Sequence, residues 1–239
     1  MFNFSSNESV VLSNGQMIHY HLKRRQRRSL GLKITFDGLV VHAPFLMSKN
    51  KINTLLVNKT KWLLSKINSI QPTPTSFKVG DNEVFMLFGA DIIIKTKIGL
   101  KRAINISSNI CMITQKDKDN DIQITQYFKK WLKQHALEFF SDRVQFYCRK
   151  NGFSVRNIYI SNAKTRWGTC NSKADIRLNW RLIQAPLDVI DYVICHELSH
   201  TLFMNHSQQF WHQVSTIFPN YKDAESYLKA QGLNLYRLD

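Results

Sequence analysis

Three residues in the C-terminal part of the chain have the types and spacing needed to bind a metal ion. His196, Glu197 and His200 form the pattern HExxH. Positions four apart lie on one face of a helix, so both imidazoles could hold one ion from the same side. Glu197 would then reach a water bound to that ion. Zn²⁺ suits this set, because it binds imidazole and leaves a position for a water whose proton the carboxylate can accept.

The residues around this pattern predict a helix. Pro186 is suited to the first helical position, and Asp188 would lie near the positive end of the helix dipole. A broad apolar stripe follows at Val189, Ile190, Val193, Ile194, Leu198 and Leu202. The alternative interpretation is a buried helix whose two histidines are hydrogen-bonded members of the core.

A third histidine, His206, follows His200 by six residues. A continuous helix would carry it about 9 Å further along the axis and onto another face. It can bind the same ion only if the helix ends first, and Asn205 favours such an end at Met204–Asn205. His212, within a predicted helix over 207–218, is the other possible ligand. Three protein ligands plus a water is typical of catalytic zinc, whereas four ligands close a structural site.

Charge is the unusual feature of the composition. The 239 residues include 33 Lys+Arg and 17 Asp+Glu, which gives a formal net charge of +16. Such a balance favours anionic partners, among them nucleic acid, acidic proteins and membrane surfaces. Basic clusters lie at 23–28 and 129–133. Two interpretations stay open here, a site for a polyanion and a solvated basic surface.

The cysteines and the apolar pattern bear on the compartment. Cys111, Cys148, Cys170 and Cys195 show no CxxC spacing, which argues against a disulfide framework and for a reducing environment. The N-terminal residues are polar, unlike a signal peptide, and no apolar run reaches the roughly 18 residues of a membrane span. We therefore expect a cytoplasmic protein that does not associate with membranes.

The pattern of the whole chain predicts an α+β fold. Residues 1–70 are expected to form a β-rich region with one helix, 77–115 a β-strand region, and 120–239 the domain that contains HExxH, with a small antiparallel sheet packed on its helix. Asp37-Gly38 predicts a hairpin turn, Ser48 a helix start, and Asn151-Gly152 a helix end. Strands are expected at 16–22, 29–36, 39–42, 83–88, 91–96, 102–106, 110–114, 155–161, 165–169 and 176–179. Helices are expected at 48–67, 122–150, 207–218 and 220–231, with a stiff linker at 71–76.

Several motifs together resemble one known family. They are Asn162-Ala-Lys-Thr-Arg-Trp-Gly-Thr-Cys170, Ile176-Arg-Leu-Asn-Trp-Arg-Leu182, Val189-Ile-Asp-Tyr-Val193, HELSH and Asn205-His-Ser-Gln-Gln-Phe-Trp211. With weaker N-terminal counterparts at Arg27-Arg-Ser29, 37–44 and Lys61-Trp62, the chain resembles the YgjP-like zinc metallopeptidases, which are relatives of the SprT-like proteases. Thr169 stands where this family more often has Ser.

This resemblance implies a zincin-like metallopeptidase domain. It implies a zinc site of His196, His200 and His206 with Glu197 as the general base, and protein or peptide substrates. It does not identify the natural substrate.

Four further residues are expected to contact substrate or support the metal ligands: Arg166, Trp167, Asn179 and His212. Arg166 could stabilise a developing oxyanion, or could equally hold its neighbours in place. The function hypothesis is a zinc-dependent metalloendopeptidase in which a metal-activated water attacks the peptide bond. The alternatives are a SprT-like protease that acts in association with nucleic acid and a zinc-stabilised DNA-binding module.

Overall fold

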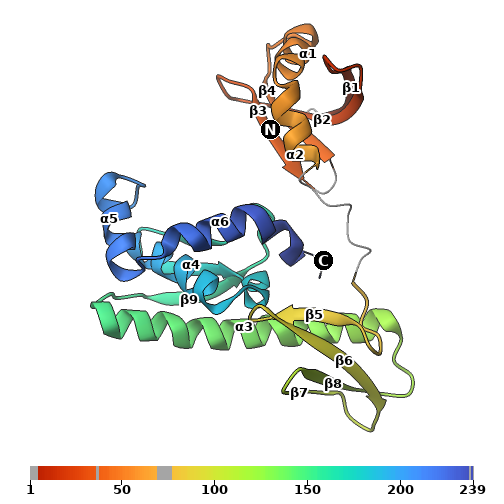
Figure 1. Ribbon diagram of the computed structural model, residues 1–239, viewed down its shortest axis with the longest axis vertical. Coiled ribbons are helices and arrows are strands. Elements are labelled where there is room, and N and C mark those ends of the chain that lie inside the picture. Colours follow the sequence, from red (N-terminus) through yellow and green to blue (C-terminus); the bar gives the residue numbers. More distant parts are fainter. Residues whose placement is uncertain (1–4, 36–37, 69–76, 237, 239) are drawn as a thin grey trace. The chain divides into compact units, whose positions relative to one another are not determined.

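A computed structural model describes residues 5–35, 38–68, 77–236 and 238. The chain divides into two compact units, Met1–Pro74 and Thr75–Asp239, which are called unit 1 and unit 2 below. Each unit has its own hydrophobic core. Figure 1 shows the elements of both units.

Unit 1 contains a four-stranded sheet in the order β1-β2-β4-β3. The strands are β1 (Ser5–Val11), β2 (Met17–Arg25), β3 (Gly31–Thr35) and β4 (Gly38–Pro44). β2 and β4 run parallel, and the other two pairs are antiparallel. Thr35 lies opposite Gly38 in the β3–β4 pair, while Asp37 of the predicted hairpin turn lies outside the described residues. The strand Ser5–Val11 was not predicted, because its residues are mostly polar and exposed.

Two helices cover one face of this sheet, where the single helix 48–67 was predicted. They are α1 (Lys49–Asn58) and α2 (Thr60–Asn68). The side chain of Ser48 accepts a hydrogen bond from Lys51 N, as expected of a helix cap. The break falls at Lys59, and the Thr60 hydroxyl next to it accepts a hydrogen bond from Ser13 N. This contact with a residue distant in sequence is a feature that helical periodicity does not report.

Unit 2 begins with a second four-stranded sheet, in the order β5-β6-β8-β7. Its strands are β5 (Val84–Leu87), β6 (Ala90–Ile98), β7 (Ala103–Ser107) and β8 (Ile110–Gln115). The long helix α3 (Asp121–Asn151) packs against it through Phe128, whose ring meets Phe85 edge-on at 5.0 Å. As predicted, Gly152 ends this helix, in the left-handed conformation with φ of 73°.

A three-stranded sheet follows, in the order β10-β11-β9. Its strands are β9 (Asn157–Ser161), β10 (Gly168–Cys170) and β11 (Asp175–Asn179). β10 and β11 are antiparallel, but β11 and β9 run parallel, so the sheet is mixed and the prediction of an antiparallel sheet was wrong in this respect. The parallel pair arises because residues 162–167 return the chain to the edge of the sheet before β10 begins, which residue alternation cannot reveal.

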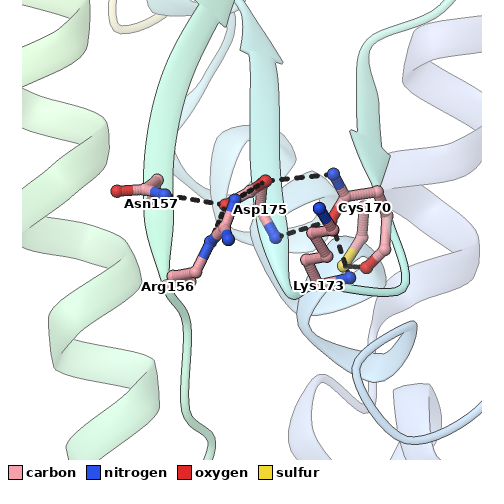
Figure 2. Close-up of polar contacts among 6 residues, drawn as sticks. Arg156, Asn157, Cys170, Lys173 and Asp175 are labelled. Carbon is pink, nitrogen blue, oxygen red and sulfur yellow. Dashed lines mark hydrogen bonds and ion pairs between the residues drawn. The ribbon is translucent and has the colours of Figure 1, made fainter.

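A buried carboxylate fixes the turn between β10 and β11. Asp175 accepts hydrogen bonds from Arg156 Nε at 2.8 Å, Asn157 Nδ2 at 2.8 Å and Asn171 Nδ2 at 3.1 Å (Figure 2). These donors, Arg156 first among them, hold the pKa of Asp175 well below its usual range. The network links the starts of β9 and β11 to the turn between β10 and β11, and so holds the edge strand β10 in place.

The remaining helices complete unit 2. They are the 3-10 helix η1 (Trp180–Gln184), α4 (Leu187–Ser199), α5 (Gln208–Ile217), α6 (Tyr221–Gln231) and the 3-10 helix η2 (Gly232–Tyr236). Figure 1 shows α4 and α6 on the same side of α3. No helix in the described part of the chain is both long and apolar enough to cross a membrane.

Contacts before α4 and along its first half fix its position. Before it begins, the β5–β6 turn donates hydrogen bonds from Phe88 N to Ile183 O and from Gly89 N to Gln184 O. Along its length, Asp191 accepts hydrogen bonds from Arg143 Nε of α3 at 2.8 Å and from the Tyr147 hydroxyl at 3.1 Å. These contacts limit rotation of α4 about its axis, which sets the direction of the side chains on its last turns.

Candidate metal centre

The last turn of α4 carries His196 and Glu197, and His200 is its C-terminal cap. The helix therefore ends at Ser199, five residues before the predicted end at Met204–Asn205. Asn205 has no positive φ, so the left-handed Asn expected there is not what closes the helix. Instead, Thr201 N bonds to Leu198 O and the side chain of Thr201 bonds to the same carbonyl. The earlier end gives the chain room to bring His206 back beside the helix.

The three histidines of the sequence prediction lie together. One nitrogen atom from each of His196, His200 and His206 can be chosen so that all three lie within 4.8 Å of one another. The Nε2 atoms of His196 and His206 are 3.1 Å apart. Nitrogen ligands about 2.0–2.1 Å from a tetrahedral ion would be about 3.3 Å apart. The spacing of these donors is therefore that of a metal centre.

The hydrogen bond made by His200 leaves its Nε2 nitrogen available to bind a metal ion. Its Nδ1 lies 2.9 Å from Phe203 O. A carbonyl oxygen can only accept, so Nδ1 carries the proton and Nε2 keeps its lone pair. Burial lowers the pKa of His200. Burial also lowers the pKa of His196, to about 3, and the nearby His200 and His206 contribute to this shift. Both rings are therefore neutral at neutral pH, which is the form that binds metals.

Phe210 forms the floor beneath the three imidazoles. This fully buried ring of α5 has its centroid 4.8 Å from His196, 4.5 Å from His200 and 4.8 Å from His206. Ser207 caps α5 by accepting a hydrogen bond from Phe210 N. From the sequence, the apolar Phe210 could be assigned only to a buried face of the predicted helix 207–218. No local signal links Phe210 to the histidines, because His206 precedes Ser207, the cap of α5, and is not part of the helix.

Glu197 is buried against the edge strand. Its side chain is 4% exposed, and its Oε2 atom has no hydrogen-bond partner among the described residues. A Cβ atom added to Gly168 of β10 would lie 2.4 Å from Glu197 Oε1. Only a glycine therefore lets this carboxylate occupy its position. Burial raises the pKa of Glu197 to about 8, and the positive charge of Arg166 acts in the opposite direction. A bound metal cation nearby would also favour the ionised form.

The donor atoms of the three histidines and the nearby Glu197 are of the kinds that bind and support a metal ion. Three imidazoles converge, and His196 Nδ1 and Glu197 Oε2 are buried polar atoms without partners in the described structure. Buried polar atoms without partners are rare and mark functional sites more often than ordinary cores. Imidazole ligation suits Zn²⁺ as well as other transition metals.

The other predicted site residues occupy different positions. Arg166 is exposed and close enough to influence Glu197, whereas His212 is exposed on α5 and lies outside the group of three imidazoles. Trp167 packs against Tyr236 at 5.3 Å between ring centroids. Asn179 is fully buried and donates from Nδ2 to Ala163 O at 2.8 Å and to Arg166 O at 3.3 Å. It holds the segment that carries Arg166 and Trp167.

Trp211 lines a shallow pocket of about 350 Å³. Its ring is stacked on His206 at 5.8 Å and on Tyr221 at 5.5 Å, so this side chain is shared by the pocket and the group of histidines. The pocket is lined by both apolar and charged groups, Trp211, Tyr221, Lys222, Glu225 and Ser226.

The family comparison decides the class of protein. A model of the YgjP-like metallopeptidase domain matches residues 28–231, which is most of the chain. The chain belongs to the YgjP-like metallopeptidase family. The family resemblance stated from the motifs is thus confirmed, and the chain is a metallopeptidase, which implies a bound metal ion and protein or peptide substrates. No curated protein gives a significant match.

Two solved structures align with part of this YgjP-like metallopeptidase. The metallopeptidase zymogen abylysin of Pyrococcus abyssi is 21% identical, with 38% of this chain and 93% of that chain covered and a TM-score of 0.36. The metallopeptidase zymogen jannalysin of Methanocaldococcus jannaschii is 25% identical, with 38% and 91% covered and a TM-score of 0.32.

Proposed function

We propose that this metallopeptidase is a zinc-dependent endopeptidase of zincin-like architecture, with His196, His200 and His206 as metal ligands and Glu197 as the general base. The observation that carries the proposal is the convergence of three imidazole nitrogens within 4.8 Å, beside a buried carboxylate that has an unpartnered oxygen. This combination suits metal-assisted hydrolysis of a peptide bond.

Each residue has a distinct part in the proposed reaction. When bound, zinc acts as a Lewis acid that polarises the substrate carbonyl and lowers the pKa of water to about 7. Glu197 Oε2 accepts the proton of the attacking water and later delivers it to the leaving amine. His200 is held for its task by Nδ1–H donating to Phe203 O, and Phe210 keeps the three rings in place from below. Arg166 is exposed and its positive charge acts on Glu197, so it can also attract a substrate carbonyl or carboxylate there.

The edge strand β10 supports an extended substrate beside Glu197. It is the outer strand of its sheet, and α4 packs against it. Asn179 N donates to Trp167 O at 2.8 Å, so Trp167 and Thr169 direct their backbone groups toward β11. The backbone N–H and C=O groups of Gly168 and Cys170 then face the outer edge of the sheet, where a peptide can pair with them. The pocket beyond Trp211 offers room for one substrate side chain.

Metal analysis tests this proposal. Protein purified without chelator should carry about one zinc per chain. A chelator should abolish cleavage of a proteome-derived peptide mixture, and added zinc should restore it. Zinc would be measured by elemental analysis and cleavage by mass spectrometry. A folded protein that stays metal-free in the presence of zinc, or one that cleaves peptides equally well after zinc is removed, would contradict the proposal.

A second prediction concerns Gly168. Gly168→Ala should lower kcat about 10²-fold, because the new methyl group would displace the Glu197 carboxylate, and misplacing a reacting group by about 1 Å can cost this much. The fold and zinc content should persist, since the displaced atoms belong to the end of a flexible side chain. Gly80→Ala is the matched control, because its Cβ would meet Glu83 Cγ at an ordinary 3.5 Å. Equal activity of the two variants would show that Gly168 does not position Glu197.

A further inference from the structure

The sheet of unit 1 has one covered and one uncovered face. Along β2, residues Ile18, Tyr20 and Leu22 are buried, whereas the alternate positions Met17 and His19 are exposed. The buried positions join the core formed with α1 and α2. Side chains alternate between the two faces of a sheet. The positions that alternate with the buried ones therefore line the other face, which no described element of unit 1 covers.

Cations gather on this uncovered face. Lys23 and Arg25 share it with Met17 and His19 by alternation along β2. His42 of the central strand β4 is paired with Lys23 of β2 and with Gly31 of β3, its two neighbouring strands. Lys33 of β3 shares the face because it lies two residues after Gly31.

Arg27 joins them from the connection between β2 and β3. Its guanidinium nitrogen atoms lie 2.4 and 2.7 Å from the place that a Cβ of Gly31 would occupy. Since Gly31 is paired with His42, that place is on the uncovered face. The guanidinium therefore lies directly over Gly31, where any side chain at position 31 would exclude it.

The basic face is defined as Lys23, Arg25, Arg27 and Lys33, and no ion pair compensates its charge within the described part of unit 1. None of the four has an ion-pair partner among the described residues. Glu8 is the one acidic residue in the described part of unit 1, and it lies opposite the buried Tyr20, where it bonds to Lys49 and Ser6. Burial lowers the pKa of His42, and so do the charges of Arg25, Arg27, Lys23 and Lys33. Like charges on neighbouring strands destabilise a sheet, so the arrangement favours an anionic partner.

We propose that this basic face binds the phosphate backbone of single-stranded nucleic acid. Three histidines lie among or beside the cations, His19 and His21 on β2 and His42 on β4. His21 is held by its Nδ1, 2.7 Å from Asn7 Oδ1. Planar imidazoles between cations give unpaired bases a surface on which to stack, while the cations contact phosphates. An acidic peptide would use only the charges. The exposed apolar residues of β1 and β2 on this face, Val11 and Met17, lie at the end of the β1–β2 pair remote from Arg25.

Salt-dependent binding by the full-length chain tests the proposal. Affinity for a fluorescent single-stranded oligonucleotide would be measured by anisotropy over a range of salt concentrations. Each phosphate contact contributes about −0.7 to the slope of log K against log salt. The triple variant Lys23→Gln, Arg25→Gln and Lys33→Gln should therefore make the slope shallower by about 2. The control variant Lys51→Gln, Lys59→Gln and Lys61→Gln removes the same charge from exposed positions on the helical side and should leave the slope unchanged.

Three results would overturn the proposal. The control variant on the helical side could lose as much affinity as the variant of the basic face. The loss would then depend on net charge alone and not on this face. Polyglutamate could bind as tightly as the oligonucleotide at equal salt, which would point to acidic proteins. Phosphatidylserine vesicles could bind more tightly than either, which would point to a membrane surface. Glu197→Gln should bind the oligonucleotide like wild type, so the outcome is independent of the peptidase proposal.

Discussion

Glu197→Gln should give a folded, zinc-loaded protein whose peptide hydrolysis is slower by about 10²–10⁴-fold, the usual contribution of a general base. Glutamine keeps the length and shape of glutamate, so the packing of the side chain against Gly168 should persist. Its amide cannot accept a proton from water, and the proposed mechanism loses that step alone. Because Glu197 is not among the three metal-binding histidines, zinc should remain.

The measurement pairs the cleavage rate with zinc content and circular dichroism. Glu83→Gln is the matched control, because Glu83 is exposed next to β5 and its substitution removes the same charge. It should retain wild-type cleavage. If Glu197→Gln cleaved at the wild-type rate, Glu197 would not be the base. If Glu197→Gln lost its zinc, the carboxylate would have to be counted among the ligands.

Local signals in the sequence were sufficient for much of the framework. Gly152 ends α3 in the left-handed conformation and Ser48 caps the start of α1, both as predicted, because caps depend on residues close in sequence. The grouping of His196, His200 and His206 could also be predicted, since it requires only a helix and a turn after it.

Features that depend on distant contacts could not be predicted. The strand Ser5–Val11 has little apolar pattern and exists because it pairs with β2. The division between α1 and α2 involves a contact with Ser13. The parallel pairing of β9 with β11 depends on the path of residues 162–167. Register and pairing of this kind are set by packing across the fold, not by local periodicity.

The site itself shows the same limit. From the sequence, Gly168 could be placed only within the expected strand 165–169, yet it touches the carboxylate of Glu197, which is 29 positions later in the sequence. Phe210 could be assigned to a buried face but not to the floor of the metal centre. Both roles arise because β10 and α5 pack on the end of α4, and a single sequence does not record which elements meet.

His206→Ala should lower zinc affinity far more than His212→Ala. His206 offers its Nε2 atom 3.1 Å from that of His196, whereas His212 is exposed on α5 outside the group. Removing one of three ligands leaves two imidazoles. Losing a residue that only supports a ligand typically costs about 10–100-fold in metal affinity or activity, and we expect His212→Ala to cost no more than this.

Competition with a chromogenic chelator would measure zinc affinity for both variants, with circular dichroism to establish that each is folded. The exposure of His206 makes the alanine variant easy to accommodate in the fold. His206→Gln gives a second test, because it keeps a polar side chain of similar size but replaces the imidazole. Should His212→Ala lose zinc while both His206 variants keep it, the third ligand would be His212, and the turn after α4 would serve another purpose.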